Sequence, residues 1–390
     1  MKKSVFLSAF ILLAVFAFAQ MKKDRTSAFN YWQKGDLIKA RDYIDKAIAY
    51  PEAATDAKVW YYRGGIYLDI QLKPEFKILA PDALTISYDA YTKSRELDVK
   101  EEYRSDIISR LQTIEGQLFN DGIAFFQAED IDNALLYFEK AVKLGKEINV
   151  VDTVALFGSA LCYEKKGDKA KAIEIYSNLV EMQMNEKNIY SSLAMLYLDT
   201  EQNEKAISTI EKGLERFPGD NDLTVTQANV YIRTKQHEKA LKSLNAAREK
   251  EPGNASVLYA IGVTYDLMRG DAGFSQEDRD KYFDAAIKAY EETLLVDPAY
   301  FDALFNIGVL HFNRGGDLIN AANKLPLSES QKYEELMADG TKYLQKALPY
   351  FENAEKIKPT DRDLLVSLKE IYTRLNLMEK LKEVNAKLQQ

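Results

Sequence analysis

Apolar and small side chains recur along this chain at the spacing of a helix face, and the whole pattern repeats every 34 residues. Four tyrosines carry the period most clearly: Tyr163, Tyr197, Tyr231 and Tyr265. Three positions before each tyrosine stands a small residue: Ala160, Ala194, Ala228 and Gly262. A fixed period of this length is typical of one supersecondary unit copied many times, so the length of the chain counts units rather than domains.

One period, residues 221–254, predicts a helical hairpin. Its first helix carries Ala228 and Tyr231, and its second runs from His237 to Glu249 with apolar residues at i, i+4 and i+7. The small side chain of Ala228 lets the two helices approach closely, and the tyrosine ring fills the neighbouring gap. Pro252 ends the second helix before the next period begins.

This pattern resembles the tetratricopeptide repeat family, in which a small residue is followed by tyrosine at +3, alanine at +12, an apolar residue at +16, alanine at +19 and proline at +24. The corresponding residues of this period are Ala228, Tyr231, Ala240, Leu244, Ala247 and Pro252. Other periods depart from the motif: Gly213 replaces the later alanine in one, and the period of Ala160 lacks the proline. The resemblance implies an all-α fold, a right-handed superhelical solenoid of antiparallel helix pairs with about eight units.

The repeats are expected to span residues 24–359, followed by a polar capping helix pair at residues 360–390. Three insertions lengthen individual units, near residues 68–83, 269–280 and 313–340. The first insertion contains prolines and predicts an irregular loop, and the second predicts a flexible exposed turn. The third predicts that both helices of its hairpin continue outward.

Helix-favouring sequence stands on both sides of Leu325 and Pro326, so we expect a projecting hairpin over residues 313–345. Pro349 should kink its returning helix. A further long helix is expected over residues 101–128, with its first half outside the repeat motif.

The start of the chain predicts a signal peptide over residues 1–19. Lysines precede an apolar run from Val5 to Phe18, and Ala17-Phe18-Ala19 gives the small-x-small cleavage pattern before Gln20. The alternative is an uncleaved anchor helix, but the apolar run is shorter than the roughly 20 residues that span a bilayer. We therefore expect an exported bacterial protein, located in the periplasm, associated with the envelope or secreted.

Cysteine usage and charge narrow the function classes. Cys162 is the single cysteine, so no internal disulfide can form, and it is too far from the signal junction to carry a lipid. The formal net charge is −8, and loss of Lys2 and Lys3 would make it −10. Nucleic-acid binding needs a basic surface, so nucleic acid is not an expected partner. No transmembrane span is expected in the mature chain.

No catalytic, cofactor or metal site is predicted. His237 and His311 stand 74 residues apart, whereas metal ligands cluster, and His311 takes a slot that other units fill with tyrosine. A nucleophile would need a positioned base, and no glycine-rich phosphate loop of the right spacing occurs. An enzyme is therefore the least expected class, and no cofactor is expected.

The resemblance also implies a working surface, because the first helices of such units line a concave face. Counted from the small residue, the exposed positions are −3, +1, +4 and +5. The candidate partner-binding residues at these positions are Phe119, Ile123, Phe126, Phe157, Leu161, Met195, Leu198, Asn229, Arg233, Tyr259, Val263, Phe305 and Phe312. A contiguous apolar stripe usually marks a protein-binding surface. The alternative is that a tight superhelix or the projecting hairpin covers part of it.

Three functions follow, in order of preference. The first is a non-catalytic interaction scaffold that binds a peptide or helix of another protein in the concave groove. The second is a structural role through self-association or assembly in an envelope complex, using the 313–345 hairpin and the convex face. The third is glycan or cell-wall binding by aromatic stacking, which is weaker because most tyrosines hold core positions. The sequence identifies neither the partner nor the oligomeric state.

Overall fold

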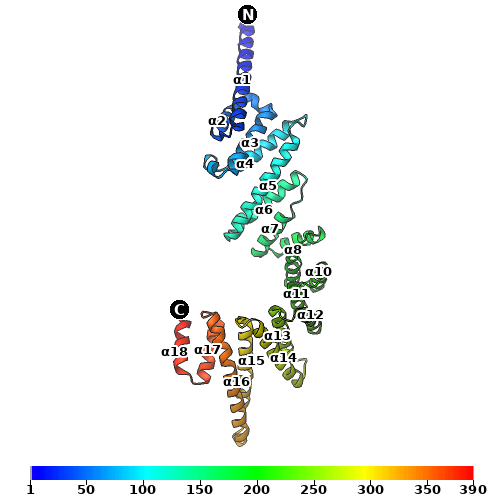
Figure 1. Ribbon diagram of the computed structural model, residues 1–390, viewed down its shortest axis with the longest axis vertical. Coiled ribbons are helices and arrows are strands. Elements are labelled where there is room, and N and C mark those ends of the chain that lie inside the picture. Colours follow the sequence, from blue (N-terminus) through cyan, green and yellow to red (C-terminus); the bar gives the residue numbers. More distant parts are fainter. Residues whose placement is uncertain (1, 390) are drawn as a thin grey trace. The chain divides into compact units, whose positions relative to one another are not determined.

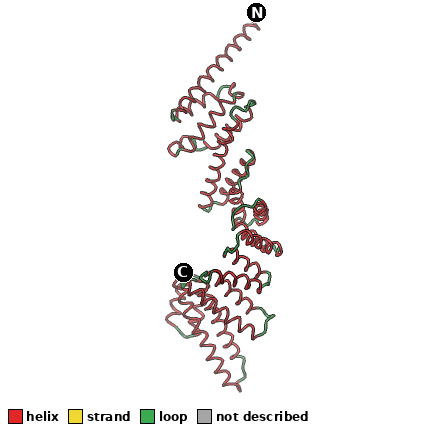
Figure 2. The backbone as a smooth tube through the Cα atoms, turned by 45° about the vertical axis from the view of Figure 1, so that its right-hand side comes forward, coloured by secondary structure: helices red, strands yellow, loops and turns green. Residues whose placement is uncertain are grey.

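The computed structural model describes the backbone of residues 2–389 and the side chains of residues 16–389. Every regular element in this part of the chain is a helix (Figure 1; Figure 2). The chain divides into two compact units, Met1–Met184 and Asn185–Gln390. In each unit consecutive helices pack as hairpins, which confirms the all-helical repeat architecture expected from the 34-residue period.

The described part of the first unit holds four helical hairpins. They pair α1 (Lys2–Gln33) with α2 (Leu37–Ile48), α3 (Ala57–Leu72) with α4 (Ala83–Leu97), α5 (Arg104–Gln127) with α6 (Ile131–Glu147), and α7 (Thr153–Lys165) with α8 (Lys169–Glu181). Two 3-10 segments, η1 (Pro51–Thr55) and η2 (Pro74–Leu79), lie between helices. The long α5 corresponds to the helix predicted over residues 101–128.

The second unit, as far as it is described, holds four hairpins and a final pair. They are α9 (Asn188–Asp199) with α10 (Asn203–Arg216), α11 (Asn221–Arg233) with α12 (His237–Lys250), α13 (Ala255–Gly270) with α14 (Gln276–Val296), α15 (Phe301–Ala322) with α16 (Ser330–Ile357), and α17 (Arg362–Arg374) with α18 (Met378–Leu388). A 3-10 turn, η3 (Leu327–Glu329), joins α15 to α16. Over both units the hairpins match the expected number of repeats followed by a capping pair.

The turn inside a hairpin is set by acidic caps. Asp36, Asp130 and Asp168 each precede the second helix of a hairpin, and each carboxylate accepts a hydrogen bond from a backbone N–H of the first turn. The residue just before the cap turns the chain through the left-handed region. That residue is Gly167 with φ +78° in one hairpin, but Glu129 with φ +60° in another.

In most hairpins the size of one residue at the centre of the first helix depends on whether the facing residue of the second helix is an aromatic ring. We number positions from the small residue of each first helix, leaving out inserted residues, so the ring stands at +16. The glycine–ring pairs in contact are Gly64–Tyr91, Gly122–Phe138, Gly262–Tyr290 and Gly308–Phe351. The hairpins with alanine and an aliphatic residue at these positions have Ala28 with Ile44, Ala194 with Ile210, and Ala228 with Leu244. Ala160 with Tyr176 is the exception.

Tyrosines at +3 join one hairpin to the hairpin before it. The hydroxyl of Tyr231 in α11 donates a hydrogen bond to the Glu211 carboxylate in α10, at 2.9 Å. Tyr163 in α7 donates in the same way to Glu139 in α6. The periodic tyrosines therefore do more than fill a gap, because the partly buried hydroxyl also needs a partner.

The first two insertions are more ordered than the sequence indicated. Residues 74–79 form η2, and the Leu79 carbonyl accepts a hydrogen bond from Arg41 at 3.0 Å. In the second insertion α13 continues through Gly270, and Arg269 forms an ion pair with Asp266 at 2.9 Å. The expected flexible turn is thus reduced to residues 271–275, because both helices of this hairpin extend into the insertion.

The third insertion forms the projecting hairpin that was predicted. α15 and α16 continue beyond the repeat, and the tip around η3 stands clear of neighbouring helices (Figure 1). Gly315 and Gly340 face each other where the two helices cross, and a Cβ on Gly340 would lie 2.9 Å from the Gly315 carbonyl oxygen. Pro349 lies inside α16, which runs on to Ile357.

The N-terminal helix enters the core of the first hairpin at Met21. This side chain is fully buried, and Asp24 one turn later is 6% exposed. The signal peptide predicted for residues 1–19 lies largely outside the described side chains, which begin at residue 16. Within the described residues, none of the helices combines the length and apolar character that crossing a membrane requires.

Candidate functional site

The predicted partner-binding residues all lie on first helices of hairpins, from α5 to α15. We call positions −3, +1, +4 and +5 of these helices the first-helix surface. Five of the predicted residues belong to the first unit and eight to the second, so the structure gives one set in each unit. Leu198 is a correction: it is only 5% exposed and belongs to the interior, because its side chain turns toward the core.

The aromatic residues at −3 pack against the ring at +16 of their own hairpin. The ring centroids are 5.7 Å apart for Phe119 and Phe138, and 5.6 Å apart for Tyr259 and Tyr290. The same arrangement joins Phe157 to Tyr176 and Phe305 to Phe351. These rings were predicted as groove lining, but their half-buried position and ring contacts make them part of the hairpin packing.

Tyr259 has further contacts besides its packing against the Tyr290 ring. Its hydroxyl accepts a hydrogen bond from the Asn306 side chain at 3.1 Å, and its ring also lies 5.1 Å from that of Tyr300. Burial raises the pKa of Tyr259 to about 12. Tyr61 on α3 holds the same −3 position against Tyr91 and was missed, although the spacing from Gly64 could have found it.

The C-terminal end of the first-helix surface is covered by the capping pair. Phe305, Val309 and Phe312 are half-buried in the core that α15 shares with α16, α17 and α18. The Arg374 guanidinium of α17 lies 5.6 Å from the centre of the Phe312 ring. These residues are therefore packed side chains rather than a free binding stripe.

The remaining candidates differ in solvent exposure. Ile123, Phe126 and Leu161 in the first unit, like Met195 and Val263 in the second, are half-buried. Asn229 and Arg233 on α11 are exposed, and so is Leu267 on α13, which the sequence analysis did not select. Arg233 forms an ion pair with Asp199 on α9 at 2.9 Å. In the second unit the accessible part of the first-helix surface therefore centres on α11 and α13.

His311 behaves as a packing residue. Its ring is 7% exposed and lies 5.8 Å from the centres of Phe283 and Tyr343. Burial, together with the charge of Lys346, lowers its pKa to about 4. Within the described residues no three His, Cys, Asp or Glu side chains gather to hold a metal ion.

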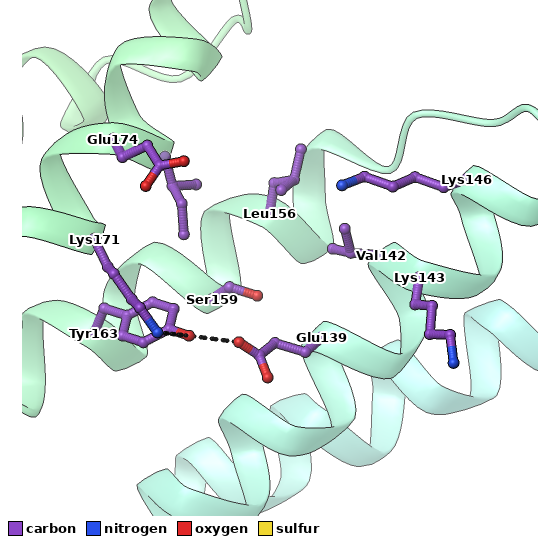
Figure 3. A pocket seen from close by; sticks show the side chains of 10 residues that line it. Glu139, Val142, Lys143, Lys146, Leu156, Ser159, Tyr163, Lys171 and Glu174 are labelled. Carbon is purple, nitrogen blue, oxygen red and sulfur yellow. Dashed lines mark hydrogen bonds between the residues drawn. The ribbon is translucent and has the colours of Figure 1, made fainter.

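A hollow of about 370 Å³ lies on the first unit among α6, α7 and α8 (Figure 3). Its central polar groups bond to one another. Tyr163 donates to Glu139, and Lys171 Nζ donates to the Tyr163 hydroxyl at 3.2 Å. The hydrogen bond to Glu139 raises the pKa of Tyr163. Because these groups already have partners, the hollow is best explained as the joint between two hairpins.

A second cavity, of about 340 Å³, lies between α4, α5 and α6 of the first unit. Leu84 and Tyr88 come from α4, Leu118 and Asp121 from α5, and Tyr137 from α6. The irregular spacing of the second repeat is the one feature of the sequence that bears on this cavity.

Comparison with known proteins identifies the repeat. The family model described as tetratricopeptide repeat matches residues 119–186, 192–266 and 267–325, which is just over half of the 390 residues. No curated protein matches the chain.

Several solved structures are similar over about half of the chain or more. YrrB, described as a tetratricopeptide repeat protein with an unusual peptide-binding site, is 20% identical over 48% of this chain and 88% of its own, with a TM-score of 0.37. A protein from Thermus thermophilus is 22% identical over 48% of this chain and 94% of its own, with a TM-score of 0.37. One from Bacteroides fragilis is 18% identical over 66% and 98%, with a TM-score of 0.29. On the match to the family model, this chain belongs to the tetratricopeptide repeat family, whose members are typically non-catalytic and generally act as protein-interaction scaffolds.

Proposed function

We propose that this chain is an exported, non-catalytic scaffold that binds a segment of a partner protein, extended or helical, on the first-helix surface of its second unit. The observation that carries the proposal is the exposure of Asn229, Arg233 and Leu267 on consecutive first helices. Leu267 is 45% exposed, and half-buried Met195 and Val263 add apolar area on α9 and α13. Apolar anchors with polar groups around them are the composition of a protein-binding patch.

The 34-residue period supports a linear partner. Arg233 and Leu267 are equivalent positions of successive hairpins, so one partner segment running across first helices would meet a cation and then an apolar side chain. The ion pair with Asp199 holds the Arg233 guanidinium in place, and its other N–H groups can donate to a polar group of the partner. Repeat proteins commonly use such regularly spaced positions to hold an extended segment or helix.

Export is the second part of the proposal. It rests on the charged start, the apolar run and the small-x-small motif of residues 1–19. The first buried side chain of the repeat core is Met21, so removal of these residues would leave the packed part of α1 in place. The expected site of action is the periplasm, the envelope or the medium.

Site-specific photo-crosslinking tests the binding surface. A benzophenone side chain is placed at residue 229 or 267, and at Lys242 on the second helix α12 as an exposed control. We expect one crosslinked partner from both first-helix positions and none from the control, because only the former would touch the bound segment. Equal labelling at all three positions, or none at 229 and 267, would contradict this assignment. Mass spectrometry of the adduct identifies the partner.

The projecting hairpin favours a second candidate function, assembly of the chain with itself. Leu327 at its tip is fully exposed, beside Leu325 and Pro326. Large apolar side chains at the tip of a projection are a typical docking element. Light scattering on the native chain and on Leu327→Asp tests this idea. A mass above one chain that falls in the variant supports self-association, and an identical monomer mass for both excludes it.

A further inference from the structure

The cavity between α4, α5 and α6 exists because the second repeat is irregular. α4 begins only at Ala83, after an insertion that ends in the cavity wall at Pro81, and α5 has more than two turns outside the repeat motif. The cavity measures about 340 Å³, which is within the range of sites for small organic molecules.

The walls of this cavity are braced. The Tyr88 hydroxyl of α4 donates a hydrogen bond to Glu147 Oε2 of α6 at 2.8 Å. Near the ends of the same two helices, Arg95 donates to the Glu147 carbonyl at 3.5 Å. α4 and α6 are thereby held at a fixed separation on either side of α5, so the space is preformed rather than opened by a ligand.

The floor of the cavity is apolar. Ile114 and Leu144, which are 1% and 2% exposed, belong to the core of this part of the first unit. Leu84, Leu118 and Tyr88 are half-buried against the same core and also line the cavity. Ile114, Leu118 and Asp121 follow one another at i, i+4 and i+7, so α5 presents two apolar side chains and then a carboxylate on one face.

The charges around this floor are mostly acidic. Four carboxylates, Asp82, Asp89, Asp121 and Glu147, line the cavity with two ammonium groups, Lys140 and Lys143. Glu147 is bonded to Tyr88, and Lys140 lies 4.9 Å over the Tyr137 ring.

Three of these carboxylates, Asp82, Asp89 and Asp121, have no hydrogen bond or ion pair in the described residues, and Asp121 is set apart because it is half-buried on α5 whereas the other two are exposed. Burial raises the pKa of the Asp121 carboxyl, and the charge of Lys77 opposes that rise. A carboxylate in this position gains from a cationic partner, because the partner restores the interaction that burial has removed.

We propose that this cavity binds a small organic cation in which a protonated amine is joined to an apolar or aromatic body. The amine pairs with Asp121, and the body lies on Leu118, Leu84 and Tyr88. The site is independent of the proposed partner-binding surface, which belongs to the second unit. It makes the first unit a ligand-binding module within a scaffold.

Calorimetric titration of the full chain with tyramine tests the proposal. We expect saturable binding, weakened about tenfold by Asp121→Asn, because the variant loses the charge-assisted hydrogen bond to the ammonium group. Glu181→Gln on α8 is the matched control, since it removes the same charge from an exposed position outside the cavity. It should leave the affinity unchanged.

Two further measurements separate charge from shape. Thr85→Trp, an exposed position in the cavity wall, should block tyramine while leaving Asp121 in place. 4-Ethylphenol, the neutral analogue, should bind at least tenfold more weakly than tyramine. The proposal is overturned if the native chain does not bind tyramine at millimolar concentration, if 4-ethylphenol binds equally well, or if 3-(4-hydroxyphenyl)propionate binds more tightly. Thermal melting of each variant shows whether it is folded.

Discussion

At the scale of single residues, the contact between a glycine and a ring recurs as the device that closes a hairpin. Gly262 allows the Tyr290 ring to lie directly against the backbone of α13. Tyr259, three positions earlier, packs its own ring against that of Tyr290. Where the +16 residue is aliphatic, as at Ile210 or Leu244, alanine fits at the centre of the first helix. A larger side chain on the second helix is thus matched by a smaller residue on the first.

Gly262→Ala should destabilise the chain. Its Cβ would lie 2.5 Å from ring atoms of Tyr290, and overpacking of this kind costs about 1–3 kcal/mol. Tyr290→Leu in the same chain should recover much of that loss, because leucine with alanine is the pairing used in the hairpin of Ala228. Urea unfolding of the two single variants and the double variant measures the coupling.

The matched control is Gly316→Ala in α15. A Cβ at Gly316 would meet nothing within 4 Å, so this change should stabilise the helix by about 0.5–1 kcal/mol. If Gly262→Ala changed the free energy of unfolding in the same way as Gly316→Ala, the contact between Gly262 and the Tyr290 ring would not contribute to stability.

Buried His311 and half-buried Glu115 make stability depend on pH in opposite directions. His311 in the second unit has a folded pKa of about 4, below its value of 6.5 when unfolded. The unfolded chain therefore binds more protons between these values, and this contribution to stability is lost as the pH falls. Glu115 in the first unit has its pKa raised to about 8 by burial and by Asp152, so its contribution is lost as the pH rises.

His311→Tyr isolates the histidine contribution, because tyrosine holds the same slot in other hairpins. Between pH 7 and pH 5 the native chain should lose about 2 kcal/mol more stability than the variant. Both proteins are unfolded in urea at each pH. Because both contain Glu115 and the other carboxylates, the contribution of these groups to the pH dependence cancels in the difference. Parallel pH profiles for the two proteins would show that the pKa of His311 is not lowered by folding.

At the scale of elements, the 34-residue period predicted the number and order of the hairpins. The small residue, the tyrosine and the alanine occur at fixed offsets, so helix positions could be read from the sequence. The insertions were harder to interpret, because a proline or glycine signals a break only when tertiary contacts do not override it. η2 is ordered by packing of Phe76 and Leu79 on the first core, and α13 continues past Arg269 because α14 also starts early.

The projecting hairpin depends on the close approach of its own two helices. A Cβ on Gly340 would meet the Gly315 carbonyl oxygen at 2.9 Å and Ile319 Cγ1 at 2.7 Å. Gly340→Ala should therefore loosen residues 316–339 by about 1–3 kcal/mol, since a backbone carbonyl cannot turn aside as a side chain can.

Hydrogen exchange measures this effect locally. Amides of residues 316–339, the projecting part of the hairpin, should exchange faster in the variant. Amides of α17 and α18 should stay protected. Asp339→Ala is the neighbouring control, because it removes only the exposed ion pair with Lys342. Unchanged exchange in Gly340→Ala would mean that the two glycines are not what holds the tip together.

At the scale of the whole molecule, the sequence predicted the type of protein but only part of its candidate site. The offsets from the small residue identified the first-helix surface, yet they could not tell which side chains a neighbouring helix covers. Phe312 is covered by Arg374 of the capping pair, and Leu198 turns inward. The cavity around Asp121 was missed because it is formed by the departure of α4 and α5 from the repeat.

Processing of the N-terminus can be tested on the mature protein. We expect N-terminal sequencing of material recovered from the envelope fraction or the medium to begin at Gln20. A chain starting at Gln20 should unfold at the same urea concentration as the full chain. A chain starting at Arg25 should lose about 2 kcal/mol or more, because it lacks the buried Met21. Recovery of uncleaved protein from the cytoplasm would exclude export.

The pairing of glycine with ring also bears on how such a chain can change over time. Tyr290 and Gly262 belong to the same hairpin, so copying or transplanting that hairpin as a block keeps the matched volumes together. Apart from the hairpin of Ala160 and Tyr176, where alanine already faces a ring, a crossover inside a hairpin would press a ring against an alanine, or pair a glycine with a smaller residue and leave a void. Recombination between hairpins should therefore be tolerated where recombination within them is not, and engineered arrays would be cut at the same boundaries.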